Sequence, residues 1–383
     1  MDKEITSKEI MSFYEKREEN KGLFTPNITN RKNRSNSNKK ELNIVYVMVW
    51  TEVCGGSKIL LQYINKLSEL GHKLTIVSYD KKPTWYDLDD NVNFIKVELD
   101  EELNEKIPEC DLVIATSWKT ISDCVTANVA PVIYFEQGGS HLFEVENIRK
   151  EKYELVKNRF DMLENIYTVS NYAKDCIKKY YGKDSTVIPN AVDKNIFYVN
   201  ENKKVDKDKI TLTTIGSEDF KFKNVSEIIA AVEKLQENYD NIDFKWISQK
   251  EPVEHKIDCI VNPKQHVIGD VLRNTDIYVC ASEYEAFGLP LLEAMSCGAT
   301  AITTDTGGSS DIVKEGVNGL YIEKHNIEDM CNKIEYLINN KELMDKFKEE
   351  AKKTAAQYSW DISTRKIEEY YQGIFCKKIE FER

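Results

Sequence analysis

Two carboxylates frame a glycine–proline turn in the stretch SEYEAFGLPLLEAMSCG, residues 282–298. Glu285 precedes the turn and Glu293 follows it, while Pro290 fits the first helical position, where a missing N–H costs nothing. The free backbone amides of the turn would then lie at a helix N-terminus: Phe287, Gly288 and Leu289. Such amides and the helix dipole favour an anion such as a diphosphate.

Carboxylates beside a phosphate-binding turn suit a ligand that carries both hydroxyls and phosphates. A nucleotide sugar is such a ligand. The same residues also fit an ordinary strand–loop–helix unit of an α/β protein, with solvated carboxylates at the start of the helix.

Short apolar runs alternate with helical patterns along most of the chain. The run LNIVYVMVW from residue 42 is apolar except for Asn43, as expected for a strand covered on both faces. A glycine pair, a helical stretch to Leu70 and the run KLTIVSY follow it. A second alternation starts near Ile210, and each alternation predicts a parallel sheet in a Rossmann-like domain.

The predicted organisation is two α/β domains after an N-terminal extension. Residues 1–40 form this extension, a short helix followed by a basic polar linker with no acidic residue between Lys21 and Lys40. Residues 41–190 form the first domain, together with a closing helix over 358–383, and residues 191–357 form the second. We expect the extension to be dispensable for folding because it offers little apolar surface to bury.

The composition favours a cytoplasmic enzyme. The formal charge of -12 argues against general nucleic-acid binding. Nine scattered cysteines without a CxxC pair suit a reducing compartment. The chain has no apolar run of about 18 residues, and its first residues, MDKEITSKEI, lack the apolar core of a signal peptide. Any membrane contact would be peripheral, at the inner face, through the basic linker.

Residues 282–298 resemble the E-x7-E donor motif of the retaining glycosyltransferases of family 4, which have the GT-B fold. Further stretches resemble that family in the same order, so the likeness covers roughly residues 42–375. They are CGGSKILLQYINKLSELGHKLTIVSYD, TVSNYAKDCIKKYYG with VIPNAVDKNIF, TTDTGGSSDIVKEGVNGLYIE and YSWDISTRKIEEYYQGIF. The resemblance implies two Rossmann-like domains that face each other across a cleft, with the closing helix crossing back to the first domain.

The resemblance places a nucleotide sugar in the second domain. Glu285 would hydrogen-bond hydroxyls of the transferred sugar, and Glu293 would accept hydrogen bonds from the ribose. The backbone from Ala286 to Leu289 would present its amides to the diphosphate or the sugar.

The diphosphate also needs cations. Family members usually carry an arginine just after a strand-end glycine and a lysine several residues on. Here the glycine is Gly216, the arginine position holds Ser217, and Lys223 fits the lysine position better than Lys221. The loss of one cation weakens the expected stabilisation of the leaving group, and Lys221 could compensate for it.

The first domain would bind the acceptor. Gly55 and Gly56 open its first helix and let the backbone approach a ligand closely. His141 could lie near the transferred sugar, as a histidine of this region often does in the family, or be a surface or capping residue. Trp118 could stack on a sugar face or simply be packed. The other polar candidates are Glu136 and Gln137.

We interpret the sequence as a retaining hexosyltransferase that uses a nucleoside diphosphate sugar and a hydroxyl of a glycan, lipid-linked or protein acceptor. The candidates for catalysis are Glu285, Lys223 and His141. No residue stands out as a covalent nucleophile, so the resemblance implies front-face attack, with the departing diphosphate helping to deprotonate the acceptor.

Asp87 and Asp89 form a DxD pair, which binds a divalent cation in other glycosyltransferase folds. They lie far in sequence from the donor motif, and we expect neither a metal nor a cofactor. Two alternatives are a non-catalytic GT-B subunit that binds a glycan or another transferase, which Ser217 favours, and an epimerase of the same architecture. Nothing in the sequence indicates an oligomeric state.

Overall fold

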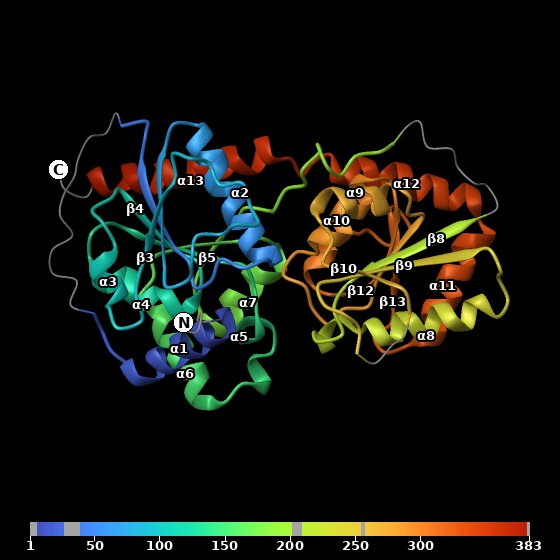
Figure 1. The fold of residues 1–383 in the computed structure, drawn as a ribbon, viewed down its shortest axis with the longest axis horizontal. Coiled ribbons are helices and arrows are strands. Elements are labelled where there is room, and N and C mark those ends of the chain that lie inside the picture. The colour runs from blue at the N-terminus through green and yellow to red at the C-terminus, as the bar shows by residue number, and fades with distance from the viewer. Residues whose placement is uncertain (1–5, 27–38, 201–208, 254–256, 381–383) are drawn as a thin grey trace, which may run out of the picture. The chain divides into compact units, whose positions relative to one another are not determined.

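The computed structural model describes residues 6–26, 39–200, 209–253 and 257–380. In its described part the chain forms two compact units, each built on its own parallel sheet (Figure 1). The first unit comprises Met1–Val169, Ala173–Ile188 and Thr364–Arg383, and the second comprises Ser170–Tyr172 and Pro189–Ser363. Most of the predicted basic linker, and most of the predicted loop over 200–209, fall outside the described residues.

The sheet of the first unit has, within the described residues, seven strands in the order β3-β2-β1-β4-β5-β6-β7. The order reverses between β1 and β4, as in a Rossmann fold. Nearly every residue of β1, β4 and β5 is buried, which explains why their sequences are almost entirely apolar. The strands are β1 (Asn43–Val47), β2 (Lys73–Ser78), β3 (Asn93–Lys96), β4 (Leu112–Ala115), β5 (Val132–Glu136), β6 (Asn165–Thr168) and β7 (Thr186–Val187).

Helices connect these strands, and α2 shows how the sequence specifies one of them. It buries a stripe at helical spacing that includes Ile59, Tyr63 and Leu67, and it packs beside β2. At its start the Ser57 N–H donates to the Sγ of Cys54 at 3.3 Å, so the glycine pair lies in the first turn. The helices of this part of the chain are α1 (Ser7–Lys21), α2 (Gly55–Glu69), α3 (Leu103–Lys106), α4 (Trp118–Ala127), α5 (Ser140–Phe143), η1 (Val145–Asn147), α6 (Lys150–Asp161) and α7 (Asn171–Tyr181).

The sheet of the second unit has, in its described part, six strands in the order β10-β9-β8-β11-β12-β13. This order again reverses once, between β8 and β11, so the sheet has the same Rossmann-like switch point as the first. The strands are β8 (Ile210–Ile215), β9 (Ile242–Ser248), β10 (Cys259–Val261), β11 (Ile277–Cys280), β12 (Thr300–Thr304) and β13 (Gly319–Ile322).

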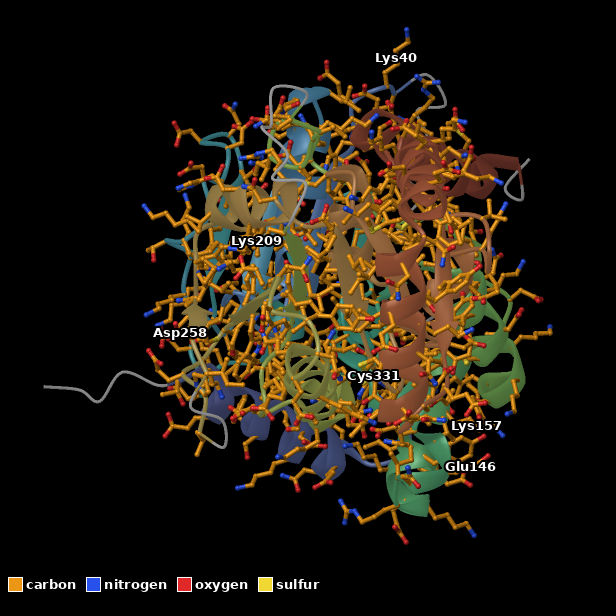
Figure 2. The ribbon with its side chains drawn as sticks, turned by 90° about the vertical axis from the view of Figure 1, so that its right-hand side faces the viewer. Lys40, Glu146, Lys157, Lys209, Asp258 and Cys331 are labelled. Atoms are coloured by element: carbon orange, nitrogen blue, oxygen red, sulfur yellow. The ribbon has the colours of Figure 1, made fainter. Side chains whose placement is uncertain are left out.

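Helices of the second unit pack on this sheet around a buried apolar core. Ile228 of α8, Ile302 of β12 and Ile334 of α11 belong to that core. The helices are η2 (Lys221–Lys223), α8 (Val225–Gln236), α9 (Gln265–Arg273), α10 (Leu289–Ser296), η3 (Gly308–Asp311), α11 (Ile327–Asn339) and α12 (Lys341–Ala355). Charged side chains stand at the surface of both units, among them Lys157 and Glu146 in the first and Lys209 and Asp258 in the second (Figure 2).

Helix α13 (Trp360–Glu380) closes the chain and packs on the first unit, as predicted. The buried Tyr371 hydroxyl lies 2.9 Å from the hydroxyl of Tyr46 in β1 and 3.0 Å from that of Tyr167 in β6. The start of the helix belongs to the second unit, where the Ser363 hydroxyl donates to the carbonyl of Pro189 at 2.8 Å. The predicted fold class, with its returning C-terminal helix, is confirmed.

Helix α1 is part of the packing of the first unit. Thr6 and Glu9 form a capping box at its start, and Ile10 and Tyr14 are buried. Glu18 is fully buried and forms an ion pair with Arg159 of α6, with 2.8 Å between Oε2 and Nε. The expectation that this segment offers little apolar surface to bury is therefore wrong for α1, because Ile10 and Tyr14 are buried. That the segment is dispensable for folding stays a prediction.

Two lysines of the predicted linker are also tied to the first unit. Lys21 Nζ lies 2.9 Å from Asp123 of α4, and Lys39 forms an ion pair with Asp111. Three further basic residues of the linker fall outside the described residues: Arg31, Lys32 and Arg34. Lys21 and Lys39 therefore neutralise acidic groups of their own unit.

Candidate functional site

The predicted donor residues lie on the two loops at the switch point of the second sheet. Strand β8 ends at Ile215 and leads into the loop of Lys223, while β11 ends at Cys280 and leads into the loop of Glu285. In open parallel sheets, ligands bind at such a switch point, beyond the carboxyl ends of the strands.

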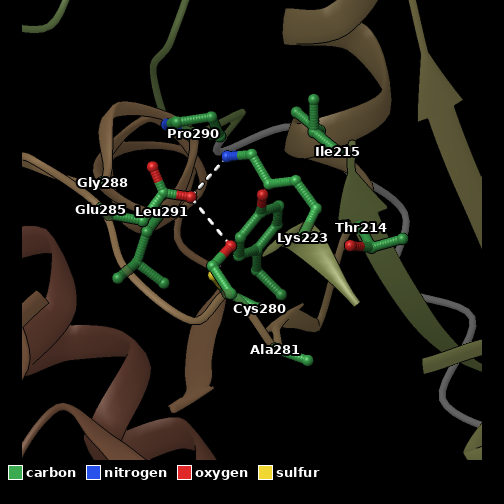
Figure 3. Close-up of a pocket in the computed structure, with 11 residues that line it drawn as sticks. Thr214, Ile215, Lys223, Cys280, Ala281, Glu285, Gly288, Pro290 and Leu291 are labelled. Carbon is green, nitrogen blue, oxygen red and sulfur yellow. Dashed lines mark hydrogen bonds and ion pairs between the residues drawn. The ribbon is translucent and has the colours of Figure 1, made fainter. Parts of the chain in front are cut away.

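Lys223 and Glu285 form an ion pair across this switch point (Figure 3). The Ser282 hydroxyl donates to the same Glu285 oxygen at 2.9 Å. The two side chains of the ion pair are only 19% and 16% exposed. Burial alone would lower the pKa of Lys223, but the Glu285 carboxylate raises that pKa above its ordinary value. The lysine is therefore a cation at neutral pH.

A small pocket opens beside this ion pair (Figure 3). Its apolar lining includes Ile215, Tyr278 and Leu291. Charges beside apolar walls interact more strongly than charges in water because the local dielectric constant is lower. The pocket thus combines a cation, a carboxylate and an environment that strengthens their effect on a ligand.

Helix α10 begins at Leu289, directly after Gly288 and one residue before the predicted first position at Pro290. Gly288 has a φ of 89°, in the left-handed region that favours glycine, and Pro290 lies in the first turn. The first N–H groups of an α-helix have no acceptor within the helix, so this end presents amides to an anion. Glu293 lies one turn inside and is 6% exposed. Phe287 is buried and its ring contacts Tyr358, which indicates packing for its side chain.

A second turn, residues 305–308, lies against Glu285 and was not among the predicted site residues. The Glu285 N–H donates to the carbonyl of Thr306, and the Gly308 N–H donates to the carbonyl of Glu285, each at 3.1 Å. A Cβ atom on Gly308 would lie 2.4 Å from the Glu285 carbonyl oxygen, so the approach requires glycine. The glycine pair in TTDTGGSSD is the sequence signal for this contact.

Ser217, at the position of the family's arginine, is buried and only 4% exposed. The carbonyl of its neighbour Gly216 accepts a hydrogen bond from the Trp246 indole at 2.8 Å, and a Cβ on that glycine would lie 3.0 Å from Val225. An arginine at position 217 would have to displace packed atoms. Lys221 lies on η2 with Lys223, so the structure places both lysines on one turn.

Glu136 and His141 form a buried pair at the carboxyl end of β5. His141 Nε2 lies 2.7 Å from Glu136 Oε2, the Tyr134 hydroxyl donates to the same oxygen at 2.7 Å, and the Gly138 N–H donates to Oε1 at 2.6 Å. Burial alone would raise the pKa of Glu136, but the charge and hydrogen bond of His141, with the other two donors, lower it. Glu136 is thus occupied by internal partners and orients His141.

The other candidates of the first unit differ in their surroundings. Gly55 opens α2, and a Cβ on Gly56 would lie 3.5 Å from the Gln137 side chain, so the glycine pair and Gln137 are neighbours. Trp118 is 4% exposed, and the Lys119 ammonium lies 5.5 Å from its ring centroid. Of the two interpretations of Trp118, burial favours packing.

Within the described residues, no group of three or more histidine, cysteine or acidic side chains is placed to hold a metal ion. Asp89 of the DxD pair accepts a hydrogen bond from the Asn91 N–H at 2.8 Å, in a local turn. The cysteines of the described chain are free. No described helix combines the length and apolar character needed to cross a bilayer. That the protein needs no metal stays a prediction.

Solved GT-B proteins are likewise built of two Rossmann-like units. The structure of Anabaena Alr3699/HepE in complex with UDP and glucose superposes with a TM-score of 0.71 at 14% sequence identity. The superposition covers 86% of this chain and 99% of that one. At this sequence identity the likeness shows the GT-B fold, and the sequence matches support a glycosyltransferase.

Within that class, residues 198–354 match the family of glycosyl transferases group 1. An uncharacterized glycosyltransferase of Methanocaldococcus jannaschii is 29% identical over 250 residues, which are 62% of this chain and 67% of that protein. A D-inositol 3-phosphate glycosyltransferase of Corynebacterium jeikeium is 33% identical over 112 residues, which are 29% of this chain and 26% of that enzyme. These matches favour a transferase over the epimerase and the non-catalytic subunit.

Proposed function

We propose that the second unit binds a nucleoside diphosphate sugar and that the chain transfers its sugar, a hexose, to an acceptor hydroxyl with retention of the anomeric configuration. The observation that carries this proposal is the Lys223–Glu285 ion pair beside the amide-bearing start of α10. The GT-B neighbour from Anabaena was solved with UDP and glucose, which supports a nucleotide sugar as the ligand.

Each group of the donor would meet a matching group of the site. The amides at the start of α10 and the Lys223 ammonium suit the diphosphate. Glu293 suits the ribose hydroxyls, and Glu285 suits hydroxyls of the sugar, since carboxylates accept hydrogen bonds. An ammonium has three N–H donors, so Lys223 can contact a phosphate oxygen while it keeps Glu285 in place.

In the proposed reaction, the bond between the anomeric carbon and the diphosphate oxygen breaks, and negative charge develops on the diphosphate. Lys223 and the α10 amides stabilise this charge, which is the main contribution that a preorganised site makes. The acceptor hydroxyl attacks the face that the diphosphate leaves, and its proton passes to the departing phosphate oxygen. The mechanism requires neither a covalent nucleophile nor a metal ion.

We also propose that the first unit binds the acceptor, through the loop of Gly56 and Gln137 and through His141. The acceptor would be a hydroxyl of a glycan, a lipid-linked sugar or a protein. The protein would act in the cytoplasm, with any membrane contact peripheral.

Turnover of the purified chain with a panel of UDP-, GDP-, ADP- and dTDP-sugars tests this proposal. We expect release of the nucleoside diphosphate with an acceptor, and NMR of the product should show the anomeric configuration of the donor. Lys223→Ala should lower kcat by about a hundredfold, because it removes one group that stabilises the leaving diphosphate. Lys353→Ala is the matched control, since that lysine pairs with Glu350 on the surface of α12.

Glu285→Ala should reduce transfer and leave the affinity for free nucleoside diphosphate almost unchanged. A large loss of nucleotide affinity in this variant would reverse the roles of Glu285 and Glu293. Full turnover by Lys223→Ala, or a product with inverted configuration, would contradict the proposed mechanism.

A further inference from the structure

The loop of Lys223 contacts the loop of Glu285 through the residues that precede Lys223 and Glu285 in the sequence. The Glu283 N–H donates to the carbonyl of Phe222 at 2.7 Å. The rings of Phe222 and Tyr284 stack with centroids 4.8 Å apart and an interplanar angle of 12°. Because Phe222 directly precedes Lys223 and Tyr284 directly precedes Glu285, these contacts fix the backbone on which the ion pair is built.

Asn224 adds side-chain contacts from the position directly after Lys223. It has a φ of 49°, in the left-handed region, and stands before the start of α8. Its amide donates to the Glu283 carboxylate at 2.7 Å and to the carbonyl of Ala281 at 3.0 Å. Both acceptors belong to the loop of Glu285, so Asn224 ties the two loops together.

His325, between β13 and α11, bridges two carboxylates. Its Nε2 lies 2.7 Å from Oε1 of Glu283, and its Nδ1 lies 2.7 Å from Oε1 of Glu227 in the first turn of α8. The contact with Glu227 is a hydrogen bond, and the contact with Glu283 is an ion pair when the ring is charged. Two carboxylates this close to one imidazole favour its protonated form, because each negative charge attracts the imidazolium. His325 has a φ of 59°, in the left-handed region, which is uncommon for residues with a Cβ but which histidine adopts more often than most.

We propose that Asn224, Glu283 and the charged His325 form a clamp that positions Lys223 and Glu285 for the donor, and that donor affinity falls when His325 loses its proton. His325 would be a positioning residue, because its contacts reach the donor site only through Glu283. The inference rests on the proposed function for its effect on the donor, whereas the clamp itself can be tested without one.

The sign of the pH dependence follows from the charges that face His325. Among the described residues these are Glu227 of α8, Glu283 of the donor loop and the adjacent Lys324. The hydrogen bond with Glu227 and the charges of both carboxylates raise the pKa of His325 above its ordinary value, and Lys324 opposes them. The clamp is therefore complete below the ordinary pKa of histidine and is lost as the pH rises through the raised value.

Hydrogen–deuterium exchange tests the clamp in the protein without ligand. Peptides covering residues 221–224 and 281–288 should be protected in the wild type at pH 6, after correction for the intrinsic rate, and less protected at pH 9. His325→Gln should abolish this difference, while Lys353→Gln on the surface of α12 should keep it. Equal protection in the wild type and His325→Gln at pH 6 would overturn the clamp.

Titration of the donor decides whether the clamp positions the site. With the sugar nucleotide that binds best in the panel above, we expect Kd to rise about threefold from pH 6 to pH 9, because exposed ion pairs have modest effects. His325→Gln should show the weaker Kd at both pH values, and His325→Gly should do the same without the left-handed strain. If exchange shows the clamp in the wild type but both variants bind the donor with the wild-type Kd, the positioning role is refuted.

The two proposals fail in distinguishable ways. If the wild type binds no sugar nucleotide, the proposed function fails, and the exchange experiment still decides whether the clamp exists. If the wild type binds a donor and both His325 variants bind it equally well at every pH, only the positioning role fails. NMR titration of His325 in Glu283→Gln provides a second check, since loss of that carboxylate should lower the pKa of His325.

Discussion

Replacing Glu18 by alanine should strongly destabilise the first unit. Glu18 and Arg159 are both 0% exposed, with 2.8 Å between Oε2 and Nε. The other Glu18 oxygen accepts from the Ser122 hydroxyl at 2.7 Å and lies 2.8 Å from Lys21 Nζ. Alanine would leave the buried guanidinium with neutral acceptors, such as the carbonyl of Gly22 at 2.9 Å, but without the Glu18 carboxylate.

Breaking one side of a buried ion pair costs about 3–5 kcal/mol, since the remaining charge stays out of water. In a domain of this size, each kcal/mol lowers Tm by about 2–4 °C, so we expect a drop of about 6–20 °C. The double variant Glu18→Met with Arg159→Met should recover most of the loss, because two apolar side chains leave no buried charge behind.

Calorimetry or urea unfolding followed by fluorescence measures this effect. Glu19→Ala is the matched control one residue away, because Glu19 is 46% exposed and pairs at 3.1 Å with an Arg149 that is 73% exposed. Exposed pairs contribute about 0–1 kcal/mol. If Glu18→Ala shifts Tm no more than Glu19→Ala does, or if removal of residues 1–22 leaves Tm unchanged, then α1 is a dispensable extension and the reasoning is wrong.

Three further predictions concern single residues. Burial lowers the pKa of Lys119 to about 8, below its value in the unfolded chain, so the charged lysine destabilises the folded protein at neutral pH. Lys119→Met should therefore raise the urea midpoint of unfolding at pH 7 and hardly change it at pH 10.5. Equal effects at the two pH values would contradict this. Glu136→Gln should lower kcat with little change in donor Kd if Glu136 orients His141, whereas a change in acceptor KM alone would indicate direct contact with the acceptor. Gly308→Ala should lower kcat/KM by displacing Glu285, while Gly373→Ala, where a Cβ meets open space, should not; similar kinetics for both would show that the 305–308 turn is unimportant.

The two loops at the switch point of the second sheet were predictable where local rules determine the backbone. The glycine and proline of the turn specify where a helix begins, and α10 begins at Leu289, one residue before the predicted first position at Pro290. The Lys223–Glu285 pair joins residues 62 positions apart, so only the fold brings them together. The parallel strand order, with its single reversal, is what makes their two loops neighbours.

The role of α1 could not be predicted, because its strongest contacts are between charges. Apolar periodicity identifies helices that bury carbon, and in that pattern Glu18 and Arg159 are indistinguishable from surface residues. The Glu136–His141 pair could not be predicted from the sequence for a related reason. Both residues are recognisable as polar groups after a strand, but their mutual contact and the burial of Glu136 depend on the packing of β5 and its turn.

Calorimetric titration of UDP, GDP, ADP and dTDP into the wild type and Glu293→Ala tests the central claim most directly. We predict that one of these nucleotides binds the wild type. Glu293→Ala should weaken that binding by about 10–150-fold, because hydrogen bonds to a charged group are worth about 1.5–3 kcal/mol. Lys353→Ala should bind as the wild type does. If no nucleotide binds, or if Glu293→Ala binds as tightly as the wild type, the second unit does not hold the donor in the way proposed.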